Sequence, residues 1–464
     1  MKVSKEIKEI DERFEENGFK LYMVGGAVRD YLLKRKVNDF DFATDATPEE
    51  IISIFRKVIP VGIEHGTVSV IHKDKQYEIT TFRSDGKYSD SRHPDSVTFI
   101  RTIDEDLKRR DFTVNAFAMD IKTKKIKDLF KGMADLKGHL IRAIGNPENR
   151  FGEDALRMLR ACRFAATLNF KIEENTLDAI KKLSHTIQNI SIERIRDEFI
   201  KIIESPKPSI GIEYMRFSGL LKEIIPELND CYEVNQNKFH KYDVYYHNLY
   251  SCDAGPKDNR VVRIAALFHD IAKPQTRKEM EENENSFYNH EIIGSYVSNK
   301  ILKRLKFSNE ERHKIVHLIK HHMFYYTQEW SDGAVRRFLR NVGLENLENL
   351  FLLREADRKG NGNKEGIPKT FLLFKKKISE IIEKDSALKV TDLDINGNQI
   401  LDATGTKPGP IIGEILDYLL ELVLDEPDLN KNQILIEQAV LYYQKKAKYA
   451  FENFGNSPEK LGKF

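Results

Sequence analysis

The stretch GGAVRD at residues 25–30, followed by NDFDF at residues 38–42, decides the fold class of the first third of the chain. Around it, the runs LYMVGG, FDFAT, TVSVIH and QYEITTF are short and rich in β-branched and aromatic residues, and Gly and Asp separate them. This pattern predicts a small sheet rather than a helical bundle. Two residues apart on a strand, Asp39 and Asp41 would point to the same face.

Two carboxylates held this close repel each other unless a cation lies between them, and oxygen ligands suit Mg²⁺. A pair of such ions stabilises the attacking and leaving oxygens of a phosphoryl transfer. Gly25 and Gly26 would let phosphates approach the backbone, and Arg29 would complement a triphosphate. Glu78, in the strand-like run YEITT, could complete the metal site; the alternative is an exposed strand residue.

A second charged motif is RRDFTVNA at residues 109–116. Its arginines, Arg110 among them, could bind phosphate, and Asp111 could accept a hydrogen bond from a ribose hydroxyl. The alternative is a surface charge cluster that precedes an apolar helix. The motifs before it favour the functional interpretation.

A third motif, EDALRMLRACR at residues 153–163, falls within GEDALRMLRACRFAATL, which predicts one continuous helix over 152–168. Asp154 and Arg157 would then be i, i+3 neighbours whose acceptor and donor could read the edge of a base. Arg160 and Arg163 would extend a cationic ridge for phosphates. The alternative is an ordinary helix with surface salt bridges.

The organisation of the chain is α+β: a small mixed head is followed by a long helical body. Residues 1–18 predict an amphipathic helix, SIERIRDEFIKIIE another, and KGNGNKEGIP at 359–368 a linker; DINGNQILDATGTKPGP reads as a turn-rich insert in a helical tail. The predicted domains are a head at 1–145, a helical neck at 146–229, a histidine-rich domain at 230–365 and a tail at 366–464.

Histidines and aspartates recur in the third domain as His247, the pair His269-Asp270, and Asp357. Imidazole and carboxylate ligands together suit a divalent transition metal, which could activate water against a phosphomonoester or a cyclic phosphate. The alternative is a set of buried structural histidines. The order H…HD…D resembles that of the HD phosphohydrolase superfamily, and by this resemblance His290 and His322 would add ligands or phosphate contacts.

The head and neck motifs together resemble the class II CCA-adding enzymes and bacterial poly(A) polymerases of the polymerase-β-like superfamily. The resemblance covers the first ~220 residues in order, and SIERIRDEF matches a motif that braces the base-reading helix. It implies a catalytic set, a nucleotide-binding set and template-independent addition of CCA to tRNA from CTP and ATP. The implied residues are Asp39 and Asp41 for magnesium, and Gly26, Arg29, Arg110, Asp154, Arg157, Arg160 and Arg163 for nucleotide or primer.

Two segments bear on specificity. Residues 61–68 resemble the CCA-adding form rather than that of poly(A) polymerases, and residues 83–94 resemble the loop that permits the switch from C to A addition. Enzymes that add only CC are therefore disfavoured, whereas an A-adding enzyme or a poly(A) polymerase stays open. Two candidate functions belong to a different class. An RNA-binding protein with an inactive head is disfavoured by the intact acidic pair and the intact Asp154 and Arg157, whereas an HD phosphohydrolase whose head only delivers RNA stays open.

The remaining expectations concern partners and location. The 75 basic and 73 acidic residues nearly cancel, so the overall charge neither supports nor excludes an RNA partner. The tail resembles the C-terminal segment of this family, which implies that it grips tRNA by shape and phosphate contacts; the alternative is a plain structural helical domain. Three cysteines without CxxC spacing predict reduced thiols and a cytoplasmic protein, and the absence of a long apolar run or signal-like N-terminus predicts no membrane association.

Overall fold

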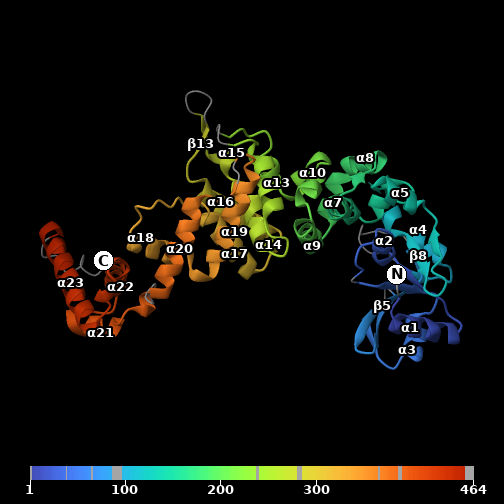
Figure 1. The fold of residues 1–464 in the computed structure, drawn as a ribbon, viewed down its shortest axis with the longest axis horizontal. Helices are drawn as coiled ribbons and strands as arrows, with labels where there is room; N and C mark the ends of the chain where they lie inside the picture. Colours follow the sequence, from blue (N-terminus) through green and yellow to red (C-terminus); the bar gives the residue numbers. More distant parts are fainter. Residues whose placement is uncertain are drawn as a thin grey trace.

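The computed structural model describes residues 3–37, 39–63, 66–85, 97–236, 240–279, 285–363, 366–384 and 389–454. The chain forms an elongated, curved body with the strand-rich head at one end of the long axis and the last helices at the other (Figure 1). Between them the described residues form helices, apart from two short two-stranded ladders. The α+β prediction is confirmed.

The head is built on a mixed seven-stranded sheet with the strand order β3-β4-β5-β2-β1-β8-β9. Strands β2 and β5 are parallel, and every other neighbouring pair in this sheet is antiparallel. The strands are β1 (Leu21–Val24), β2 (Asp41–Thr44), β3 (Val58–Gly62), β4 (Thr67–His72), β5 (Lys75–Thr81), β8 (Phe117–Asp120) and β9 (Ile126–Asp128). A separate ladder pairs β6 (Arg83–Asp85) with β7 (Val97–Phe99).

One face of the sheet packs in the main core, and the other carries a smaller apolar cluster with Ile103 and Leu107 beside its polar side chains. Phe42 and Ile79 pack in the main core with Ile10 and Phe14 of the first helix. Because successive strand residues alternate between faces, Asp41 and Glu78 point away from this core. The head helices are α1 (Lys5–Glu16), α2 (Gly26–Leu32), α3 (Pro48–Ile54), α4 (Ile103–Lys108) and α5 (Gly132–Gly138).

The main core continues from the head through a helical neck into a helical body. The neck has α6 (Pro147–Glu153), α7 (Leu156–Leu168), α8 (Glu174–Leu183), α9 (Ile192–Ile203), α10 (Pro208–Phe217), α11 (Leu220–Ile224) and α12 (Pro226–Asn229), with β10 (Leu140–Ile141) parallel to β11 (Lys171–Ile172). The body has α13 (Val244–Ala254), α14 (Arg260–Phe268), α15 (Lys273–Thr276), α16 (His290–Arg304), α17 (Asn309–His321), α18 (Asp332–Val342) and α19 (Leu344–Gly360), with the hairpin β12 (Arg277–Glu279) and β13 (Asn285–Phe287).

A second core holds the tail helices α20 (Lys369–Lys384), α21 (Gly397–Thr404), α22 (Pro410–Asp425) and α23 (Asn432–Phe454). Helix α18 shares this core: Val335 and Leu339 pack there, and Arg337 pairs with Glu421 and Asp425 of α22. The body and the tail are therefore joined by apolar packing as well as by ion pairs.

Two local predictions were wrong. The stretch 152–168 is not one helix, because Asp154 has an extended backbone (φ −146°, ψ 105°) that separates α6 from α7. Its Oδ1 accepts a hydrogen bond from the Leu156 N–H, and this alternative to helical bonding is typical of aspartate. The segment 394–410 also contains more order than a turn-rich insert, because residues 397–404 form α21 behind a capping box at Asn396.

Within the described part of the chain, no helix combines the length and the apolar character needed to cross a bilayer.

Arg263 ties the neck to the body. The side chain is buried on α14, and its Nη1 donates to the Ile203 and Ser205 carbonyls (2.7 Å each) while its Nε donates to the Gly255 carbonyl (3.0 Å). We expect Arg263→Met to lower the free energy of unfolding by about 2–4 kcal/mol, because it leaves buried carbonyls unpaired. Urea denaturation followed by circular dichroism measures this. Arg260→Met, which removes a half-exposed surface ion pair, should cost less than about 1 kcal/mol.

Candidate functional site

A cleft of about 720 Å³ lies between the head and the neck and gathers the charged residues of all three motifs. Its walls come from β2, β5, α2, the segment after α4, and α7, so residues far apart in the chain meet there. Every head and neck residue predicted for the site lines it: Gly26, Arg29, Asp39, Asp41, Glu78, Arg110, Asp111, Asp154, Arg157, Arg160 and Arg163.

The acidic wall of the cleft is set by strand pairing. In the parallel β2–β5 ladder Asp41 lies opposite Glu78, so their side chains share a face. Asp39 precedes β2 instead of lying within it, which differs from the prediction, but it lines the same cleft. Burial raises the pKa of Asp41, Arg110 lowers it, and the negative charge of Asp39 raises it further. All three carboxylates line the same cleft, and carboxylate oxygens are the ligands that a hard divalent cation such as Mg²⁺ prefers.

Arginine side chains face the acidic wall. Asp106, buried at the end of α4, holds Arg109 (2.7 Å) and Arg110 (3.2 Å) by ion pairs. Gly25 has a positive φ of 65°, and a Cβ built on it would lie 3.0 Å from Arg110 Nη1. Glycine therefore serves this position twice: it adopts the left-handed conformation, and it leaves room for the guanidinium.

A hydrogen-bonded chain connects three of the predicted residues across the cleft. Arg29 Nη1 donates to Asn115 Oδ1 (2.7 Å), Asn115 Nδ2 donates to Asp111 Oδ1 (3.2 Å), and Arg160 Nη2 pairs with Asp111 Oδ2 (2.6 Å). Burial alone would raise the pKa of Asp111, but the Arg160 guanidinium and the other donors lower it to about 2. The carboxylate thus stays charged and links the head to α7.

Asp154 lies outside α7, so Asp154 and Arg157 are not i, i+3 neighbours on one helix, which corrects that part of the prediction. Asp154 Oδ2 accepts from Arg194 Nη2 of α9 (2.7 Å). Arg157 forms an ion pair with Glu153 and donates to the Arg150 and Arg109 carbonyls (3.0 and 3.2 Å). Both side chains still line the cleft, and separate neighbours hold each one in place.

The cationic wall closes around one aromatic ring. Arg29, Arg160 and Arg163 lie 5.4, 5.5 and 4.3 Å from the centroid of Phe164. Burial lowers the pKa of Arg163 to about 10, although Glu198 of α9 pairs with it (3.0 Å) and opposes the shift. The guanidinium remains charged at neutral pH, so the predicted ridge exists as a wall of the cleft.

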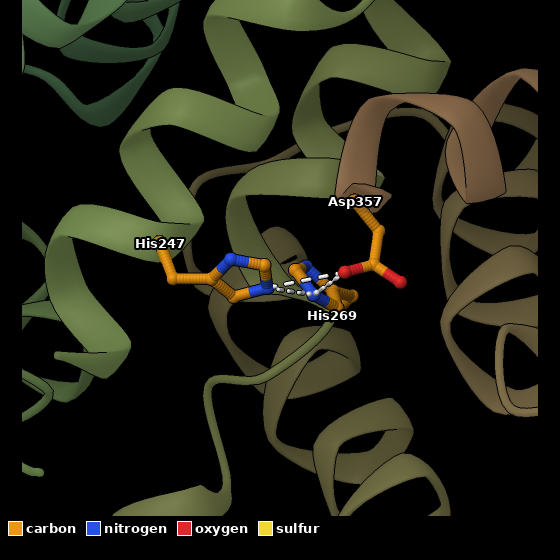
Figure 2. A group of neighbouring side chains, drawn as sticks. All are labelled: His247, His269 and Asp357. Atoms are coloured by element: carbon orange, nitrogen blue, oxygen red, sulfur yellow. Dashed lines mark hydrogen bonds and ion pairs between the residues drawn. The ribbon is translucent and has the colours of Figure 1, made fainter. Parts of the chain in front are cut away.

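A second cluster lies in the body, where Figure 2 shows His247 of α13, His269 after α14 and Asp357 of α19 pointing toward one another. The Nε2 atoms of the two histidines are 3.1 Å apart, and Asp357 Oδ1 lies 3.2 Å from the first and 3.8 Å from the second. Asp270 Oδ2 is 3.5 and 3.4 Å from the same nitrogens. All four residues predicted for this site therefore meet.

Two further histidines surround Asp270. His290 Nε2 and His322 Nε2 lie 3.2 and 3.8 Å from Asp270 Oδ1, and Lys273 Nζ lies 2.5 Å from its Oδ2. Burial alone would raise the pKa of Asp270. The charges of its neighbours, His269 and Lys273 above all, outweigh this effect and hold the pKa well below its ordinary range.

The histidine rings are oriented for metal ligation. Nδ1 of His269, His290 and His322 each lies 2.7 Å from a backbone carbonyl, and an Nδ1–H donated there turns the Nε2 lone pair toward the cluster. Burial and the neighbouring His269 lower the pKa of His322 to about 3, and burial lowers that of His269. Neutral imidazoles that face carboxylates are the donor set that a divalent transition metal requires.

Sequence reasoning missed some residues of the cleft. Asp106 could have been found from its i+3 and i+4 spacing to Arg109 and Arg110, whereas Phe164 had no signal apart from its neighbouring arginines. Residues 64 and 65 of the segment 61–68, and residues 86–94 of the proposed switching loop, lie outside the described residues.

Comparison with known proteins explains this arrangement. Three family models match: the poly A polymerase head domain at residues 21–142, the RNA- and SrmB-binding site of polymerase A at 169–232, and tRNA nucleotidyltransferase domain 2 at 293–439. The CCA-adding enzyme of Ligilactobacillus salivarius is 35% identical over 92% of this chain and 94% of its own length. The chain belongs to the CCA-adding enzyme family.

Other members of the family agree. The CCA-adding enzyme of Enterococcus faecalis is 35% identical over 94% of this chain and 95% of its own. The crystal structure of the Bacillus stearothermophilus CCA-adding enzyme in complex with CTP matches with a TM-score of 0.74 at 29% identity, over 96% of this chain and 98% of that one. The family is a nucleotidyltransferase family, and the chain is an enzyme of that type.

The Asp111–Arg160 pair makes stability sensitive to acid. In the folded protein the pKa of Asp111 is about 2, below its ordinary value. The contribution of this carboxylate to the free energy of unfolding is therefore complete above pH ~4 and is lost as the pH falls toward 2. The shift corresponds to roughly 2–3 kcal/mol. We expect Asp111→Asn to be less stable at pH 7 and to decline less between pH 4 and 2, measured by urea denaturation at each pH. Asp178→Asn, at an exposed carboxylate, should keep the wild-type slope; an unchanged slope for Asp111→Asn would contradict the assignment.

Proposed function

We propose that this protein adds CCA to the 3′ end of tRNA, one nucleotide at a time, from CTP and ATP and without a template. The observation that carries the proposal is that one cleft holds an acidic wall on the head and a base-reading pair on the neck. Relatives named as CCA-adding enzymes, and the solved structure with CTP, support it. The chain's substrates would therefore be CTP, ATP and tRNA.

Asp39, Asp41 and Glu78 would hold the magnesium ions, because all three line the same cleft and Asp41 lies opposite Glu78 in the sheet. Magnesium bound there would offset the charge that develops on the attacking and leaving oxygens. Arg29 and Arg110 would pair with triphosphate oxygens, and Gly26 would let the phosphates approach the backbone. Asp111, held by Arg160, would accept from a ribose hydroxyl.

Asp154 and Arg157 would read the incoming base. The ion pairs to Arg194 and Glu153 hold an acceptor and a donor apart at the cleft wall, where a base edge can bind between them. Arg160 and Arg163 would hold nucleotide or primer phosphates. The tail would contact tRNA, and the substrate makes the cytoplasm the expected location. Addition of A alone is the second candidate and differs only in whether CTP is used.

Removal of a metal-binding carboxylate tests the reaction. We expect Asp41→Asn to lower incorporation of both CMP and AMP by at least 10³-fold, because the metal would lose a ligand while tRNA still binds. The measurement extends tRNA transcripts that end at the discriminator base, in C, or in CC, with labelled CTP or ATP and magnesium.

Asp104→Asn, on the surface of α4, is the matched control and should keep wild-type rates. Retained CMP incorporation by Asp41→Asn would overturn the metal assignment. If the wild-type enzyme extends only the transcript that ends in CC, the A-adding candidate is favoured.

We also propose that the body is an HD-type phosphohydrolase with His247, His269, Asp270 and Asp357 as metal ligands. The observation that favours it is the convergence of buried Nε2 atoms and carboxylates in Figure 2. A divalent transition metal bound there would activate water to split a phosphate ester into an alcohol and phosphate. Lys273 would orient Asp270, and His290 and His322 would add ligands or hold the phosphate.

Two substitutions separate the proposed activities. We expect Asp270→Ala to lose bound metal, measured by mass spectrometry of the purified protein, and phosphatase activity, while CCA addition stays within about twofold of wild type. Asp41→Asn should do the reverse. If Asp270→Ala binds as much metal as the wild type, the histidine cluster is structural.

A further inference from the structure

We propose that a pocket beside the histidine cluster binds the base and adjoining phosphate of a nucleotide, an inference that rests on the proposed phosphohydrolase function. The pocket has a volume of about 360 Å³. It is called the aromatic pocket below, and its argument depends on Phe324, Tyr325, Tyr326, Arg354, Asp357 and Lys359.

The aromatic pocket and the histidine cluster share two chain segments. Helix α17 ends at His321, His322 reaches the cluster, and the residues that follow it directly, Phe324 to Tyr326, form one wall of the pocket. On α19, Asp357 belongs to the cluster and to the pocket wall. A molecule in the pocket would therefore present its phosphate to the cluster without any rearrangement of the chain.

The aromatic wall suits a planar base. Tyr325 is 78% exposed, so its ring is available to a ligand instead of filling a core. Behind it, Tyr326 stacks on Phe374 with ring centroids 4.4 Å apart and an interplanar angle of 19°, which fixes the wall in place. Bases stack on such rings with a free energy of about 1–3 kcal/mol each. A sugar phosphate without a base would gain nothing from this wall.

Basic side chains close to Asp357 on α19 could bind a phosphate. Arg354 is three residues before Asp357, pairs with its Oδ2 (3.0 Å) and lies 5.7 Å from the Phe324 centroid. Lys359 is exposed at the rim. The acid of the cluster, a guanidinium and an aromatic ring thus follow one another, in the order in which a metal, a phosphate and a base would bind. Of small metabolites, a nucleotide combines these groups.

The nucleotide could be free, or it could be the last residue of an RNA chain. Both sources share the base and the phosphate that the pocket would recognise. The pocket opens about the exposed Tyr325, so a 3′ end could enter from solvent. Binding of each source is therefore measured separately.

Trp330 provides a local probe, because it is the single tryptophan of the chain and its ring lies 5.8 Å from that of Tyr326. We expect AMP to change the Trp330 emission saturably in the full-length protein, and ribose 5-phosphate to bind at least tenfold more weakly. Tyr325→Ala should weaken AMP binding about tenfold. Tyr296→Ala, at another exposed tyrosine (65%) on α16, should leave AMP binding unchanged.

The same ligands serve as substrates, which separates the two proposals. Hydrolysis of AMP and ribose 5-phosphate at equal rates, with no Trp330 response, would overturn the base subsite and leave the phosphohydrolase standing. A Trp330 response that Tyr325→Ala removes, without hydrolysis of either compound, would overturn the phosphohydrolase and support the subsite. A hairpin RNA with a 3′-phosphate that displaces AMP would identify RNA ends as the source; failure to displace it would identify free nucleotides.

Discussion

The ion pair between Asp111 and Arg160 is the interaction on which the cleft depends. Asp111 comes from the head and Arg160 from the neck, so the pair fixes the two walls relative to each other. A buried carboxylate without a cation would be costly, and this keeps Arg160 in place. Through Asn115 the same carboxylate positions Arg29 on the opposite side. One buried charge thus aligns residues contributed by α2, the segment after α4, and α7.

The body follows a comparable rule with different chemistry. Its buried Asp270 is surrounded by His269, His290, His322 and Lys273, all within hydrogen-bonding or ion-pair reach. Backbone carbonyls hold three of the imidazoles from behind. Such a set of buried polar groups would destabilise a purely structural core, because each must be desolvated. The metal-binding role proposed above would account for this cluster.

The cleft lies between head and neck, and the cluster lies within the body. These parts of the chain succeed one another along an elongated molecule (Figure 1). One continuous core joins them, and a buried arginine, Arg263, joins the neck to the body. The two proposed activities are assigned to separate sites, because the cleft and the histidine cluster share no residue.

The sequence by itself determined the elements and the residue types of both sites: strands such as TVSVIH and the acidic, arginine-rich and H…HD…D motifs are local signals. It could not determine that Asp41 would lie opposite Glu78, because strand register depends on non-local pairing. Nor could it show the break at Asp154, where helical propensity lost to hydrogen bonds with Leu156 and Arg194. The partners of each charge, and the aromatic pocket beside Asp357, were decided only when distant segments packed together, because burial and charge pairing are properties of three-dimensional contact.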